Sequence, residues 1–266
     1  MKEKKYAWIN LIALLLTVGV NTLGGFGLIN GTDQSEVSDR YQTLITPSGM
    51  TFSIWSVIYV LLFVSILMMI LRRGVPYYER AIRQISVLFW LTCAFNIAWI
   101  VTFSFVLVEL SVLFIFALLI TLTIICRKLY LIQEDNRFLL PLTFGLYAGW
   151  LMIATVVNIS AALVKQEWDG FGVADNVWAM IILAVAVVLV LLVTMNTHNA
   201  VLPLPVAWAY FGIFSALGSE EGLPGDHTML RGFAIGGMIA LVLIAVWQFY
   251  RNRYRVTAFP EAKQVH

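Results

Sequence analysis

The chain has 266 residues, of which 61% are hydrophobic and only 12% are charged. Soluble domains contain about 45–50% apolar and about 25% charged residues, so this chain has too few charges to cover a globule of its size with a polar surface. The composition argues against a disordered protein, a secreted disulfide scaffold and a cytosolic enzyme, and it favours a polytopic membrane protein. The net charge of +2 gives no reason to expect a nucleic-acid partner.

Eight apolar runs, each free of Asp, Glu, Lys and Arg, follow one another along the chain. They cover residues 7–29, 51–71, 85–107, 110–126, 139–164, 177–196, 201–218 and 232–250. Each run is long enough to approach or cross about 30 Å of hydrocarbon, and none shows the period-two alternation of a membrane β-strand. The predicted fold class is therefore all-α, a polytopic membrane bundle of about eight helices in a lipid bilayer.

The seventh run is the weakest, because Pro203 and Pro205 interrupt its start. We keep it as a span because the basic cluster Arg251, Arg253 and Arg255 would otherwise face outward. With both termini in the cytoplasm, 14 of the 17 Lys and Arg residues lie inside, and only Arg40, Lys165 and Arg231 lie outside. This asymmetry predicts an integral protein of the cell membrane, bacterial by its resemblance below, with cytoplasmic N- and C-termini.

Seven residues of the second, third and fifth runs lie between the outer surface and the midplane, at 1.5 Å per helical residue. They are Trp55, Tyr59, Asn96, Trp99, Trp150, Ala154 and Asn158. Within each run they recur every three or four residues and so share a helix face. If the three runs face one another, they line an outward-facing aromatic pocket beneath the 30–50 loop. Such a pocket suits a planar or steroid-like apolar ligand, whereas the alternative is ordinary helix packing by Trp and Asn.

Acid–base or metal catalysis is not indicated by this sequence. The apolar runs carry no acid or base, the three histidines are scattered, and no nucleophile elbow, phosphate-binding loop or zinc-protease helix occurs. We therefore expect no catalytic residue, no metal site and no required cofactor. The two cysteines, Cys93 and Cys126, lie in or at the end of apolar runs, which predicts buried thiols rather than a disulfide.

The same residues resemble the TspO/MBR family of tryptophan-rich sensory proteins. Leu44-Ile-Thr-Pro47-Ser-Gly49, followed by Trp55 and Tyr59, is similar to the family's entry into its second helix. Asn96-x2-Trp99 with Phe103 downstream is similar to the third-helix motif. Trp150-x3-Ala154-Thr155-x2-Asn158 is similar to the fifth-helix motif and is the most specific of the matches.

Two positions depart from the family pattern. Phe52-Ser53 replaces a Gly-Pro, and Leu146-Tyr147 replaces a Pro-Tyr, both beside the expected pocket. The resemblance covers residues 7–164 and so divides the chain into a five-helix core over 1–164, three further helices over 165–256 and a cytoplasmic tail over 257–266.

The resemblance implies that the core binds a tetrapyrrole, such as a porphyrin or haem, or a sterol, and acts as its sensor or carrier. It maps the seven residues named above onto pocket positions, and it implies that homodimers can form through the third helix. Some members are linked to light-dependent porphyrin breakdown, but an enzyme is not the expectation here. The alternative function is a permease-like or accessory scaffold subunit without a small-molecule ligand, which would use residues 165–256 to hold a partner.

Three small-x3-small pairs mark close helix approaches. They are Ala94 with Ala98, Gly145 with Gly149, and Gly232 with Gly236. We expect packing within the chain at each, with dimerisation as the alternative.

Overall fold

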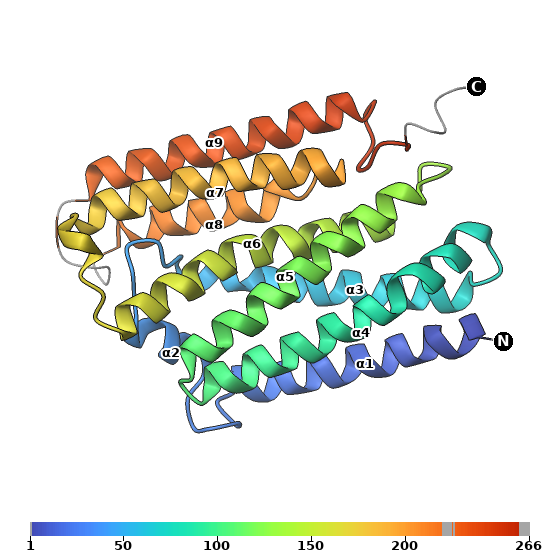
Figure 1. Cartoon of the computed structure of the whole chain (residues 1–266), viewed down its shortest axis with the longest axis horizontal. Helices are drawn as coiled ribbons and strands as arrows, with labels where there is room; N and C mark the ends of the chain where they lie inside the picture. The colour runs from blue at the N-terminus through green and yellow to red at the C-terminus, as the bar shows by residue number, and fades with distance from the viewer. Residues whose placement is uncertain (1, 220–224, 226, 261–266) are drawn as a thin grey trace.

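The structure, a computed structural model, describes residues 2–219, 225 and 227–260 (Figure 1). These residues confirm the predicted all-α class, and their β pairing is limited to one isolated bridge between Asn199 and Thr257. The described α-helices are α1 (Lys2–Gly25), α2 (Gln34–Arg40), α3 (Ile54–Leu71), α4 (Pro76–Ser104), α5 (Val108–Leu131), α6 (Leu139–Lys165), α7 (Asp175–Thr197), α8 (Pro203–Ala216) and α9 (Thr228–Arg251). Two short 3-10 helices, η1 (Gly49–Ser53) and η2 (Gly170–Gly172), precede α3 and α7.

Seven helices of the described chain are long and apolar enough to span a membrane, where the sequence predicted eight. The predicted seventh span, 201–218, is instead the 14-residue helix α8. At 1.5 Å per residue α8 rises about 21 Å, which is less than the about 30 Å of the hydrocarbon core. The residues before it form a turn in which the Asn199 side chain donates to the Pro141 carbonyl (2.8 Å) and accepts from the Val201 amide (3.1 Å).

The short helix nevertheless returns the chain across part of the bundle. Figure 1 shows α8 antiparallel to α7 and α9, so that the start of α1 and the end of α9 lie at the same end of the molecule. This agrees with the predicted topology, in which both termini lie on the same side of the membrane.

Large apolar side chains remain exposed along the outer faces of the helices. Leu16 of α1, Leu113 of α5 and Leu243 of α9 are 60%, 64% and 62% exposed. A soluble monomer rarely exposes continuous apolar surface of this extent, whereas acyl chains cover such side chains in a bilayer. The helices therefore bury one face against each other and present the other to lipid.

Helices α1, α4, α5 and α6 pack in sequence, and α7, α8 and α9 form a second group (Figure 1). The second group contacts α6 mainly through α8. A Cβ added to Gly149 of α6 would lie 2.0 Å from the Leu202 carbonyl oxygen, so the Gly145–Gly149 pair serves packing within the chain. In contrast, a Cβ at Gly232 or Gly236 of α9 would meet no atom within 4 Å.

Two smaller predictions can be compared with this fold. Cys93 and Cys126 are both free and buried, as expected. Of the predicted tail 257–266, the structure describes only 257–260, and residues 261–266 lie outside the described residues. The proposed boundary at 164 stays a prediction.

Candidate ligand-binding site

Trp55 is the centre of an aromatic cluster that joins three helices. Its ring stacks on Tyr59 of α3 (centroids 5.5 Å apart) and on Trp99 of α4 (6.0 Å). It meets Tyr147 and Trp150 of α6 edge-on, at 5.9 and 6.3 Å. The second, third and fifth spans therefore converge, which is the arrangement that an aromatic pocket requires.

A cavity of about 50 Å³ lies beside this cluster. Five of the seven predicted site residues line it: Trp55, Trp99, Trp150, Ala154 and Asn158. Phe52, ahead of α3, meets Trp150 edge-on at 5.9 Å and closes one side of the same cavity. Ligand pockets are typically about 300–1,000 Å³, so this cavity must widen to admit a planar ligand.

The segment between α1 and α3 covers the cavity, as expected for the 30–50 loop. Within it, α2 begins with a capping box in which the Asp33 carboxylate accepts from the Glu36 amide and the Glu36 carboxylate accepts from the Asp33 amide, both at 2.9 Å. This pattern fixes the start of a short helix. Gln34 and Ser38, one turn apart on α2, add two polar side chains to the cavity lining.

Tyr59 and Asn96, also predicted as site residues, do not line this cavity. Asn96 is fully buried between helices: its carbonyl oxygen accepts from Asn21 of α1 (2.6 Å), and its amide nitrogen donates to the Tyr147 hydroxyl (2.9 Å). Asn96 therefore links α1, α4 and α6. Its contacts match the helix-packing alternative, and through Tyr147 it supports the ring of Trp55.

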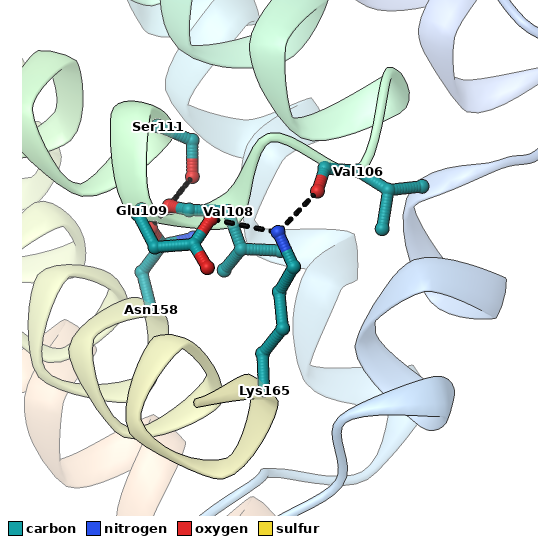
Figure 2. A network of polar contacts seen from close by, with 6 residues as sticks. All are labelled: Val106, Val108, Glu109, Ser111, Asn158 and Lys165. Atoms are coloured by element: carbon teal, nitrogen blue, oxygen red, sulfur yellow. Dashed lines mark hydrogen bonds and ion pairs between the residues drawn. The ribbon is translucent and has the colours of Figure 1, made fainter. Parts of the chain in front are cut away.

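Asn158 combines a cavity contact with an interhelical hydrogen bond. Figure 2 shows the Ser111 hydroxyl of α5 donating to the Asn158 side-chain oxygen, at 2.9 Å. One to two turns further along α6, Lys165 donates to the Glu109 carboxylate (2.7 Å) and to the Val106 carbonyl (2.8 Å). These contacts hold the end of α6 against the start of α5.

Two tryptophans of the aromatic cavity differ from several tryptophans outside it in the hydrogen bonding of their indole N–H groups. Trp90, Trp178 and Trp208 donate to Asn10, Gly170 and Thr51 at 2.7, 2.7 and 3.0 Å. In the part of the chain that the structure describes, the buried indole nitrogens of Trp99 and Trp150 have no acceptor. A buried donor without a partner is unfavourable by about 1–3 kcal/mol, so these two groups are suited to an acceptor on a bound molecule.

A second, more polar cavity of about 510 Å³ adjoins the first. Ser38, Pro47 and Phe52 line both cavities, and the far wall of the larger one comes from the end of α8. Phe52 thus stands between a polar vestibule and the aromatic cavity. Sequence reasoning noted Phe52 only as a departure from the family pattern and did not identify Gln34 or Ser38, because their role depends on how the loop folds back.

Helix α8 holds the segment that carries Phe52. The Trp208 indole donates to the Thr51 carbonyl (3.0 Å), and the Gly212 carbonyl accepts from the Ser48 amide (3.1 Å). A Cβ on Gly212 would lie 2.2 Å from the Thr51 methyl carbon, so this contact requires glycine. The helices beyond residue 165 therefore shape one wall of the site.

Comparison with known proteins gives one family. The family model described as TSPO-like protein matches residues 7–247, which extends the similarity beyond the 7–164 segment through most of the last three helices. No curated protein and no solved structure matches the chain significantly.

Proposed function

This chain belongs to the TSPO-like protein family, and we propose that it is a membrane sensor or carrier that binds a planar apolar ligand in the aromatic cavity. The ligand class is a tetrapyrrole, such as a porphyrin or haem, or a sterol-like molecule. The observation that carries the proposal is that Trp99 and Trp150 both line the aromatic cavity, while their buried indole N–H groups have no acceptor among the described residues. Planar rings would stack on the aromatic walls, and ligand carbonyl or carboxylate oxygens would accept from these donors.

Binding in this proposal needs a movement at Phe52. The aromatic cavity of about 50 Å³ is far smaller than a tetrapyrrole, but the adjoining vestibule has about 510 Å³. Rotation of the Phe52 ring would merge the two spaces. The polar groups of the vestibule, including Ser38 and Asp39, would then face the more polar edge of the ligand.

The roles of the seven predicted residues differ in this proposal. Trp55, Trp99, Trp150, Ala154 and Asn158 contact the ligand. Tyr59 and Asn96 position the cluster, because Tyr59 stacks on Trp55 and Asn96 holds Tyr147.

The test is a titration of the purified full chain with protoporphyrin, followed by its Soret shift, and with a fluorescent sterol in parallel. Trp150→Phe keeps a ring but removes the N–H, and we expect affinity to fall about threefold to tenfold, the equivalent of one hydrogen bond. Trp90→Phe is the matched control, because its N–H serves Asn10 and not the cavity. Absence of saturable binding for both ligands, or equal losses in the two variants, would overturn the proposal.

We also propose that both termini face the cytoplasm, which the distribution of Lys and Arg supports. Reporter fusions at each terminus, with an enzyme that is active only outside the cytoplasm, test this. Activity of either fusion would mean that the chain has the opposite orientation, with the aromatic cavity toward the cytoplasmic side of the membrane.

A further inference from the structure

A third cavity, of about 320 Å³, lies where the end of α6 meets the start of α7. It shares no lining residue with the aromatic cavity. Its walls come from loop residues 42–45, from the last turns of α6, from Trp168 and Gly170, and from the first two turns of α7. This cavity exists only because the chain continues beyond residue 165, and its size lies within the range of about 300–1,000 Å³ for small-molecule sites.

Two tryptophans form the aromatic side of this cavity. The rings of Trp168 and Trp178 lie 5.2 Å apart with an interplanar angle of 56°. The Trp178 indole donates to the Gly170 carbonyl (2.7 Å), which fixes the orientation of its ring. Gly170 has φ +62°, and a Cβ there would lie 3.1 Å from the Trp178 ring, so glycine is needed for this contact.

Asp175 provides the only ionisable side chain in the lining of this cavity. Among the described residues it takes part in no ion pair, whereas Lys165, on the nearby end of α6, is engaged by Glu109. The start of α7 carries a partial positive charge of about half a unit from the helix dipole, which is less than the full negative charge of the carboxylate. The neighbouring residues Glu167 and Asp169 add negative charge to the same loop.

We propose that this cavity binds an organic cation, a quaternary or protonated amine that carries an apolar substituent. A tryptophan face attracts such a cation through its quadrupole, and Asp175 supplies the opposite charge. The apolar substituent would lie against Leu163, Ala179 and Ile182. Neither an anion nor a neutral molecule of the same shape gains both interactions, so selectivity for positive charge is the distinguishing property of the site.

The experiment measures binding of benzyltrimethylammonium to the full chain in nanodiscs by equilibrium dialysis. Benzenesulfonate and neopentylbenzene, the neutral carbon isostere of the cation, serve as comparison ligands. We expect saturable binding of the cation alone, reduced about tenfold or more by Asp175→Asn and by Trp168→Leu. Glu167→Gln is the matched control, because it removes a nearby negative charge outside the cavity lining. It should leave affinity within about twofold of the unchanged protein.

Two further experiments distinguish a lipid headgroup from a free amine as the ligand, and this cavity from the aromatic cavity as the binding site. In the first, nanodiscs are made with phosphatidylcholine in place of phosphatidylglycerol. If the site takes a lipid headgroup, the quaternary ammonium of phosphatidylcholine competes and binding of the probe weakens, whereas binding is unchanged if the natural ligand is a free amine. Either result sustains the cation site. Trp150→Phe should leave cation binding intact, because Trp150 lines the other cavity. Equal binding of the neutral isostere, or an equal loss in Glu167→Gln and Asp175→Asn, would overturn the proposal.

Discussion

The rings of Trp55 and Trp99 stack with centroids 6.0 Å apart and an interplanar angle of 26°, which joins α3 directly to α4. The ring of Trp150 on α6 meets the ring of Trp55 at an interplanar angle of 86°, so the two rings are in edge-to-face contact. Three tryptophans from distant segments thus form one wall with both stacked and edge-on geometry. Such a wall offers both ring faces and ring edges to a planar ligand, and Gln34, Ser38 and Asn158 add polar side chains to the same cavity.

Asn96→Ala is expected to lower the free energy of unfolding by about 1–2 kcal/mol, because it removes two interhelical hydrogen bonds in a membrane protein. The bonds lost are those with Asn21 and Tyr147. Unfolding in SDS, followed by circular dichroism, measures the change.

Asn10→Ala is the matched control for this measurement, because it also loses two interhelical bonds, with Ser86 and Trp90, at another place in the bundle. Similar stability losses in the two variants, with ligand affinity lowered only by Asn96→Ala, would agree with a positioning role for Asn96. If Asn96→Ala left stability unchanged and removed porphyrin binding, Asn96 would instead be a direct ligand contact.

Gly149→Ala tests the attachment of α8 to α6. The new methyl group would lie 2.0 Å from the Leu202 carbonyl and 3.2 Å from Pro205, so backbone must shift, at a cost of about 1–3 kcal/mol or more. Differential scanning fluorimetry should show a clear fall in Tm.

Gly232→Ala is the control, because its added methyl group meets nothing within 4 Å. There the gain in helix propensity, about 0.5–1 kcal/mol, should leave Tm unchanged or slightly raised. Equal shifts in the two variants would contradict the close packing between α6 and the 199–205 segment.

The two thiols provide a test of the packed bundle. Cys93 and Cys126 are 6% and 2% exposed, and the Cys126 thiol donates to the Phe144 carbonyl at 3.3 Å. We expect neither to react with a water-soluble maleimide in the folded protein, and both to react after denaturation in SDS, because the reagent attacks an accessible thiolate. Mass spectrometry counts the added groups. Rapid labelling of Cys126 in the folded protein would contradict the close packing of α5 against α6.

The parts of the site that sequence could predict are those fixed by local helical geometry. Trp150, Ala154 and Asn158 recur every four residues, so their common face follows from one helix alone. The contribution of Gln34 depends on where α2 lies after the chain turns back, which no local pattern encodes. Asn96 shares a helix face with Trp99 but does not line the cavity. Its partners Asn21 and Tyr147 lie 75 and 51 positions away along the chain, so its hydrogen bonds could not be predicted from spacing.

Helix α8 shows a similar limit on the prediction of spans. The apolar run 201–218, kept as a span because of the positions of the basic residues, contains a helix of only 14 residues that begins at Pro203, after the Asn199 turn. A high hydropathy is expected both for a helix that faces lipid and for a helix buried inside the protein. Helix α8 is of the second kind, since Ala209, Tyr210 and Ile213 are all 0% exposed. A short buried helix and a membrane span therefore have the same sequence signal.

Trp208→Phe connects the last three helices to the ligand site. It keeps the ring on α8 but removes the donor to the Thr51 carbonyl, next to Phe52. Loss of one hydrogen bond of about 1 kcal/mol should loosen the wall and raise the porphyrin dissociation rate about fivefold, with little change in the association rate.

Stopped-flow fluorescence measures both rates, with Trp247→Phe as the control, because Trp247 of α9 is 40% exposed and lies over Arg251, away from the cavity. Unchanged dissociation in Trp208→Phe would mean that the segment carrying Phe52 is held by the Ser48–Gly212 backbone contact alone. A fivefold effect would show that the helices beyond residue 165 take part in ligand retention, and it would weigh against a purely scaffolding role for them.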